Sequence, residues 1–170
     1  MKKIFVDSLV ALFAILFLVH SAKANDSIRL MATGRDSSND YTIVGDMNSV
    51  NKKAANDYKR RFGNPPGTQW FSDKNGFTSY FKVDGFINRV CYDKKGNWIY
   101  SIILYNESKL PKEVRAIVKS VYYDMAIVLI KEIQTVKGIG YVINLEDETT
   151  IKIIKVNDQR EMETMQEIIK

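Results

Sequence analysis

Regularly spaced turn signals between residues 68 and 105 constrain the fold of this chain more than any other feature. Short runs of β-branched and aromatic residues alternate with these turns, which is typical of a four-stranded antiparallel meander. Asp73-Lys74-Asn75-Gly76 and Asp93-Lys94-Lys95-Gly96 each place Asp first and Gly fourth, as a type I turn with a glycine bulge prefers, and Asp84-Gly85 is a two-residue hairpin signal. These loop lengths predict which side chains share a face of the sheet.

The predicted register gives the sheet two different faces. One face is almost entirely apolar and must be covered: Phe71, Phe77, Phe81, Val83, Phe86, Val90, Tyr92, Trp98, Tyr100, Ile102 and Leu104. The other face is amphipathic: Trp70, Thr78, Tyr80, Lys82, Ile87, Arg89, Cys91, Ile99, Ser101, Ile103 and Tyr105. A sheet with one apolar face predicts helices packed on that side.

Two amphipathic segments are predicted to supply these helices. From Ser49 to Phe62, apolar side chains recur every three or four residues, and Gly63 fits the left-handed position that ends a helix. A second stripe of the same kind follows Pro111, which stands at a favoured first-turn position.

Three more strands are predicted after the second helix, at 125–135, 139–146 and 149–156. We expect a three-residue loop at 136–138, because it places one apolar set on one face: Ile127, Leu129, Ile133, Ile139, Tyr141, Ile143 and Leu145. Residues 159–170 leave two alternatives open, a terminal helix or a short strand followed by a frayed tail.

The predicted fold class is α+β, with tandem helix-plus-antiparallel-meander repeats (α-β4-α-β3/4) and the helices packed on one face of the sheet. One domain is expected at 49–170, with a first repeat at 49–105, a second repeat at 110–157 and a C-terminal tail at 158–170. The halves share a pattern of elements and little residue identity.

The N-terminal segment has the pattern of a secretory signal peptide. Lys2 and Lys3 form a positive start, residues 9–19 are uninterruptedly apolar, and Ala22-Lys23-Ala24 is a small-x-small cleavage motif. The apolar core is shorter than the roughly 20 residues that a membrane-spanning helix needs. We therefore predict cleavage after Ala24, a periplasmic or secreted protein and no stable membrane anchor after cleavage. Residues 25–48 are predicted to be a polar leader, flexible or loosely packed.

The scarcity of histidine and cysteine excludes several reaction classes. His20 is the only histidine and lies in the predicted signal peptide, and Cys91 is the only cysteine. The mature chain is therefore expected to hold no His-dependent triad, no His-ligated zinc and no intrachain disulfide. Cys91 is interpreted as a packing thiol, and Glu146-Asp147-Glu148 as a solvated turn, because its acids lack the spacing of a calcium loop. We predict no enzyme activity, no metal and no cofactor.

The charge of the chain does not favour nucleic-acid binding. Removing Lys2, Lys3, Lys23 and Asp7 from 25 basic and 20 acidic residues leaves 22 and 19, a net charge of +3. No Lys/Arg stripe of the kind that binds nucleic acid is present in the sequence.

Aromatic residues indicate a different kind of partner. Of the 16 aromatic residues after the signal peptide, 10 lie between residues 70 and 105, so they concentrate in the first meander. Trp, Tyr and Arg are enriched in protein interface hot spots. A binding site is therefore predicted on the amphipathic face: Trp70, Tyr80, Lys82, Arg89 and Tyr105. The expected partner is a protein or peptide of the cell envelope. The alternative is a ligand-sensing or signal-sensing domain with an apolar pocket between the helices and the sheet.

The order of the motifs resembles that of a known family. Its segments read W, G-[FY]-x-x-x-F, V-x-Y-D-x-x-G and L-P-x-x-V. The corresponding residues here are Trp70, Gly76-Phe77 with Phe81, Val90-Cys91-Tyr92-Asp93 with Gly96, and Leu110-Pro111 with Val114. This order is similar to the PepSY-like, beta-lactamase-inhibitor-like periplasmic proteins of Gram-negative bacteria, over residues 50 to 157. The resemblance implies a tandem helix-plus-sheet fold, an exported location and a non-enzymatic role in binding or restraining another protein.

Overall fold

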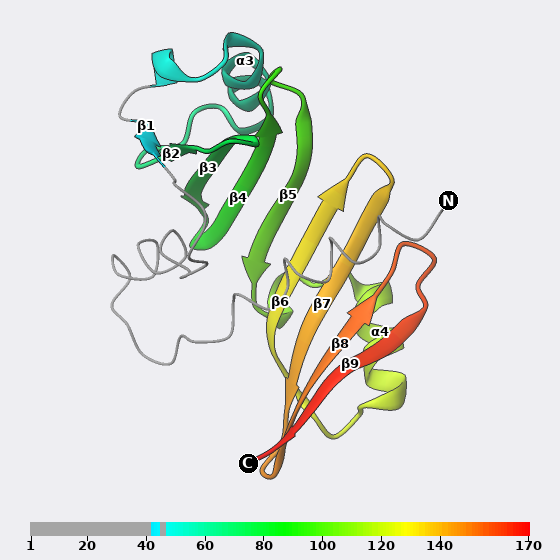
Figure 1. Ribbon diagram of the computed structural model, residues 1–170. Helices are drawn as coiled ribbons and strands as arrows, with labels where there is room; N and C mark the ends of the chain where they lie inside the picture. Colours follow the sequence, from blue (N-terminus) through cyan, green and yellow to red (C-terminus); the bar gives the residue numbers. More distant parts are fainter. Residues whose placement is uncertain (1–41, 45–46) are drawn as a thin grey trace. The chain divides into compact units, whose positions relative to one another are not determined.

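The computed structural model describes residues 42–44 and 47–170 (Figure 1). The predicted signal peptide and most of the predicted leader lie outside these residues. The strands are β1 (Thr42–Val44), β2 (Gln69–Ser72), β3 (Gly76–Val83), β4 (Phe86–Asp93), β5 (Trp98–Tyr105), β6 (Ala126–Thr135), β7 (Gly138–Glu146), β8 (Thr150–Val156) and β9 (Met162–Ile169). The α-helices are α3 (Lys52–Phe62) and α4 (Lys112–Val121), each preceded by a short 3-10 turn, η2 (Met47–Ser49) and η3 (Glu107–Lys109).

Within the described residues, all strands form one antiparallel sheet in the order of the sequence, from β1 to β9. α3 precedes β2 to β5, and α4 precedes β6 to β9, so the predicted α+β class with two helix-plus-meander repeats is confirmed. Residues 162–169 form strand β9, so the terminal helix is wrong. The strand extends to Ile169 and pairs with β8, so the alternative of a short strand with a frayed tail is right only in predicting a strand. β1 pairs with β2, so part of the predicted leader belongs to the sheet. No helix of the described residues is long and apolar enough to cross a membrane.

α3 covers the first half of the sheet because one stripe of it is apolar. The Asn51 side chain accepts a hydrogen bond from the Lys53 amide at 2.9 Å and so caps the first turn. Gly63 ends the helix at φ 71°, as its left-handed preference predicts. The ring of Tyr58 meets the rings of Trp70 and Phe81 edge-on, with centroids 5.0 and 5.2 Å apart. These contacts form the core beneath α3.

α4 covers the second half of the sheet in the same way. Val114 and Val118 are its buried residues. They pack in one apolar cluster with side chains of β6, β7 and β8: Ile127, Ile130, Ile143, Leu145, Ile154 and Val156. Each helix therefore closes its own core, and β5 contributes side chains to both cores.

Two details of the first meander reverse the predicted face of several residues. At the 73–76 turn, Ser72 pairs with Phe77 and the Asp73 amide donates to the Gly76 carbonyl, so the loop is one residue shorter than predicted. Trp70 consequently faces α3, and Phe71 faces away from it. In β5, the register shifts so that Trp98 pairs with Tyr92 and Tyr100 with Cys91, which leaves Ile99 as a bulge.

The bulge at Ile99 exchanges the faces of the rest of β5. Tyr105, predicted on the amphipathic face, lies in the core beneath α4, and Ile103 packs against that core. Tyr100, Ile102 and Leu104, predicted to be covered by helices, share a face with Cys91, Arg89 and Ile87 instead: each lies directly opposite one of them. A one-residue shift moves every later side chain to the other face, because the period of a strand is two.

The predicted loop at 136–138 is also wrong. Thr135 pairs with Gly138, so the loop has two residues, and Ile133 lies opposite Gly140 rather than on the face of Tyr141. A bulge at Val128 restores the pairing of apolar residues, because it lets Ile127 lie opposite Leu145 and Ile130 opposite Ile143. The core beneath α4 thus depends on a β6–β7 register that cannot be predicted from the length of the loop alone.

The turn between β4 and β5 contacts the start of α3 at Gly96, and we predict that this contact is required for stability. A Cβ at Gly96 would lie 2.5 Å from Asn51 Oδ1 and 2.9 Å from the Ala54 amide nitrogen, with φ at 80°. Gly96→Ala should lower the free energy of unfolding, measured in urea, by at least twice the roughly 1 kcal/mol of a strained backbone alone. The control is Gly85→Ala, because Gly85 has φ 82° and nothing within 4 Å of a Cβ. Equal losses in the two variants would contradict the proposed contact.

Alkaline pH should unfold the protein partly through Tyr58. Burial raises the pKa of Tyr58 to about 12, although its hydrogen bond with Thr68 Oγ1, 2.7 Å long, acts in the lowering direction. The folded state thus holds the phenolic proton more tightly than the unfolded chain, whose tyrosines have a pKa near 10.0. The contribution of Tyr58 to the free energy of unfolding is complete below pH 10 and is lost as the pH rises to 12.

Raising the pH from 9 to 11 should therefore lower the free energy of unfolding less in Tyr58→Phe than in the wild type. The difference between the two proteins, measured by urea unfolding, should be about 1 kcal/mol. Tyr123→Phe is the matched control, because the Tyr123 side chain is 79% exposed. If both variants follow the wild-type pH profile, Tyr58 does not contribute to it.

Candidate binding face

The sheet face opposite the helices carries the candidate site, and we call its β3 to β6 part the open face. Strand register arranges twelve side chains there in three rows across the sheet. The rows are Thr78, Cys91, Tyr100 and Thr135; Tyr80, Arg89, Ile102 and Ile133; and Lys82, Ile87, Leu104 and Lys131. Three of these residues are cations and none is Asp or Glu. The open face is therefore positively charged and rich in aliphatic and aromatic surface.

The structure brings together three of the five predicted binding residues. Tyr80, Lys82 and Arg89 lie on the open face, Tyr80 directly opposite Arg89. The prediction that Trp70 and Tyr105 share this face is wrong. Trp70 is 3% exposed in the core beneath α3, and the Tyr105 hydroxyl donates to Glu132 Oε2 at 2.6 Å on the helix side.

Phe71 and Tyr100 take the aromatic positions that the sequence assigned to Trp70 and Tyr105. Phe71 meets the ring of Tyr80 edge-on at 5.4 Å, and Tyr100 lies opposite Cys91. The turn from Asp73 to Gly76 could have identified Phe71, because a two-residue loop there, instead of the predicted three residues, places Phe71 on the open face. Tyr100 depends on the bulge at Ile99, which has no comparable signal in a single sequence.

Arg89 is the central residue of the open face. Its guanidinium carbon lies 5.5 Å from the centroid of the Tyr80 ring, a cation–π contact. Its Nε atom is buried and has no hydrogen-bond partner among the described residues. The ion pairs of the described residues do not include Arg89. The guanidinium is thus held by tyrosine and thiol neighbours and not by a carboxylate.

Cys91 connects Arg89 with Tyr100. It lies directly opposite Tyr100, it is one of the groups that raise the pKa of Arg89, and its sulfur lies 3.5 Å from Thr78 Oγ1. Burial, followed by the influence of Cys91, raises the pKa of Tyr100 well above its ordinary value. Cys91 is a free, buried thiol, consistent with its interpretation as a packing residue.

The charges of the open face repel one another. Burial by itself lowers the pKa of Arg89, but Cys91, Tyr100 and Tyr80 raise it by more, so its guanidinium remains charged. Burial and then the positive charge of Arg89 lower the pKa of Lys131. An incoming carboxylate would relieve this repulsion. The arrangement suits an acidic group flanked by apolar surface.

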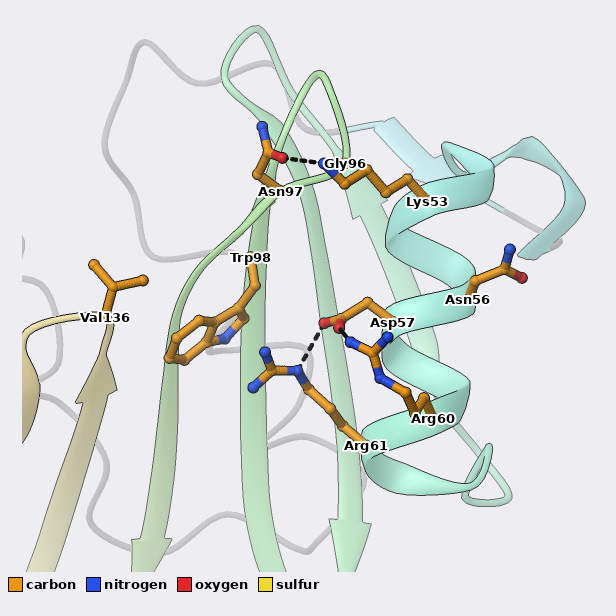
Figure 2. A pocket seen from close by; sticks show the side chains of 9 residues that line it. All are labelled: Lys53, Asn56, Asp57, Arg60, Arg61, Gly96, Asn97, Trp98 and Val136. Atoms are coloured by element: carbon orange, nitrogen blue, oxygen red, sulfur yellow. Dashed lines mark hydrogen bonds and ion pairs between the residues drawn. The ribbon is translucent and has the colours of Figure 1, made fainter.

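The described residues contain no group of three or more His, Cys, Asp or Glu that could hold a metal ion. A pocket of about 640 Å³ lies between α3 and the β4–β5 turn (Figure 2). Six of its nine lining residues are polar or charged, whereas the alternative sensing function predicts an apolar pocket: Lys53, Asn56, Asp57, Arg60, Arg61, Gly96, Asn97, Trp98 and Val136.

Solved structures from Bacteroides share the fold. A DUF2874 family protein from Bacteroides ovatus matches with a TM-score of 0.56 and 15% identity, over 74% of this chain and 89% of that chain. A BLIP-like protein from Bacteroides fragilis matches with a TM-score of 0.55 and 14% identity, over 71% and 86%. A protein from Bacteroides eggerthii that is presumed to be periplasmic matches with a TM-score of 0.54 and 14% identity, over 71% and 88%.

No protein-family model matches the sequence, and no curated protein matches it. The structural matches show that this chain has the fold of DUF2874 and BLIP-like proteins. The resemblance drawn from the order of the sequence motifs is therefore confirmed for the fold.

We predict that Arg89 contributes little to stability. A half-buried charge without a carboxylate partner is costly, and replacing such a charge with an apolar side chain of similar length is often neutral or stabilising. Arg89→Met should leave the free energy of unfolding in urea within about 0.5 kcal/mol of the wild type, or raise it. Val90→Ala, next in the chain but fully buried beneath α3, should lose about 2 kcal/mol. If Arg89→Met lowers the free energy of unfolding as much as Val90→Ala does, Arg89 has a structural role.

Proposed function

We propose that this chain is a non-catalytic binding module of the cell envelope that uses the open face to bind, and thereby block, a protein or peptide. The observation that carries the proposal is Arg89, a charged side chain without a carboxylate partner, between Tyr80 and Tyr100. The signal-peptide pattern of residues 1–24 and the similarity to a protein presumed to be periplasmic support export. The similarity to a BLIP-like protein supports protein binding.

Arg89 defines the chemistry of the partner. A carboxylate that approaches the open face can accept two parallel hydrogen bonds from a guanidinium. Ile87, Ile102 and Leu104 surround this position and would exclude water from the pair. The partner segment is therefore expected to place one acidic side chain, flanked by apolar residues, against Arg89.

The module would act by occlusion. Each of the twelve side chains of the open face belongs to a residue that is paired with a neighbouring strand, so these side chains are held on a rigid surface. A rigid aromatic and arginine surface loses little conformational entropy on binding. Covering the partner's own site would inhibit it without a chemical step.

The test compares wild-type protein with Arg89→Met and Arg115→Met in capture from a periplasmic extract, followed by titration against the purified partner. Arg115 is the control because it lies on α4 and pairs with Glu107 Oε1 at 2.6 Å, away from the open face. Arg89→Met should raise the dissociation constant at least about 30-fold, because removing one member of a buried charge pair costs about 2 kcal/mol or more. Arg115→Met should change it less than about twofold.

Equal binding by Arg89→Met and the wild type would overturn the assignment of the open face. Loss of binding by both variants to the same extent would show that overall charge, and not the Arg89 position, holds the partner.

A further inference from the structure

The pocket beside α3 is a second, separate feature with its own chemistry. It lies on the helix side of the sheet, because Trp98 packs against the core beneath α3, whereas Arg89 lies on the opposite face. In Figure 2, Lys53 of the helix is directed toward Asn97, and Arg61 lies beside Trp98 of β5, with Val136 beyond Trp98. We call it the α3 pocket.

Helical spacing places three cations on the pocket side of α3. Lys53 and Arg60 are seven residues apart and therefore project from nearly the same face of the helix, whereas Arg61 projects about 100° further round. All three side chains line the pocket. Lys53 Nζ donates a hydrogen bond to Asn97 Oδ1 across the pocket, which ties Lys53 to the β4–β5 turn.

Asp57 holds the two arginines in place. Its Oδ2 accepts from Arg61 Nε at 2.8 Å, and its Oδ1 accepts from Arg60 (Figure 2). Oδ2 also accepts from the Tyr92 hydroxyl at 3.2 Å. Asp57 is the only carboxylate in the lining, which leaves the pocket with a formal charge of +2. Most N–H groups of the two guanidiniums remain available, because a guanidinium carries five and Asp57 has only two oxygens.

Trp98 forms an aromatic wall beside these charges. The Arg61 guanidinium carbon lies 4.6 Å from the centroid of the indole ring, and the Trp98 Nε1 atom donates to Ser101 Oγ at 2.9 Å. The second contact fixes the orientation of the ring. Val136, 80% exposed, adds an apolar surface to the lining.

We propose that the α3 pocket binds a small phosphomonoester, with the phosphate between Lys53, Arg60 and Arg61 and the organic part against Trp98 and Val136. A phosphate monoester carries about −1.5 to −2 charges at pH 7, which matches the +2 of the lining. Guanidinium forks recognise phosphate oxygens in a bidentate manner. The volume of about 640 Å³ leaves room for an organic group beside the phosphate. This inference does not depend on the proposed function of the open face.

The test is calorimetric titration of the full chain with phenyl phosphate, which combines a phosphate dianion with a planar apolar ring. We expect saturable binding with a dissociation constant below about 1 mM. Inorganic phosphate, which lacks the ring, and phenyl sulfate, which carries a single charge, should each bind at least fivefold more weakly. The two comparisons separate the contributions of the aromatic wall and of the second charge.

Variants of α3 locate the site. The double variant Arg60→Gln and Arg61→Gln should weaken phenyl phosphate binding at least tenfold, whereas Lys59→Gln should change it less than twofold. Lys59 is a matched control, because it is an exposed cation of the same helix that does not line the pocket. Circular dichroism and thermal unfolding check that the double variant is folded. If it is not, Lys53→Gln removes one exposed cation without touching Asp57 and should weaken binding at least threefold.

Three results would overturn the proposal. The first is absence of saturation up to about 10 mM phenyl phosphate. The second is equal weakening by Lys59→Gln and the pocket variants, which would mean non-specific attraction to a basic helix. The third is equal affinity for phenyl phosphate and inorganic phosphate, which would exclude a role for Trp98 and Val136 in recognition.

Discussion

A single extra residue in β5 decides which side chains of that strand face the helices and which face away. Ile99 has no partner in β4, so the strand changes its alternation between Trp98 and Tyr100. Trp98 remains under α3, while Tyr105 reaches the core beneath α4. Without the bulge, Tyr100 would compete with the helices for space, and Tyr105 would leave a gap in the second core. Both helix-covered cores depend on this one irregularity.

The two faces of the sheet have different roles as a consequence of the bulge at Ile99. Helix contacts supply the stabilising apolar burial on one side: Tyr58, Phe81 and Val90 beneath α3, and Val118, Ile130 and Ile143 beneath α4. The open face is then free to hold a charged residue that weakens the fold. The protein can hold Arg89 without a carboxylate partner, because apolar burial beneath the two helices supplies its stability.

The open face and the α3 pocket use arginine in different ways. Arg61 is preorganised by Asp57 and stacked on Trp98, so its position is set before any ligand arrives. Arg89 is positioned by the aromatic ring of Tyr80 and by the Cys91 thiol, and no carboxylate of the described residues neutralises it. The first arrangement suits a small anion with defined geometry, and the second suits a carboxylate that arrives with an apolar surface.

The sequence by itself determined the elements and their order, because helix periodicity, capping residues and turn signals are local properties of the chain. It placed α3 between Ser49 and Gly63, four strands between residues 68 and 105, and Tyr80, Lys82 and Arg89 on one face of a meander. Only the tertiary structure decided the register, because bulges at Ile99 and Val128 arise from how strands fit beneath the helices and leave no local signal. The bulge at Ile99 places Tyr100 rather than Tyr105 on the face of Arg89. The shorter loop at the 73–76 turn places Phe71 rather than Trp70 there. The α3 pocket also depends on tertiary structure, since it joins a helix to a turn about 40 residues away, a distance that no local pattern spans.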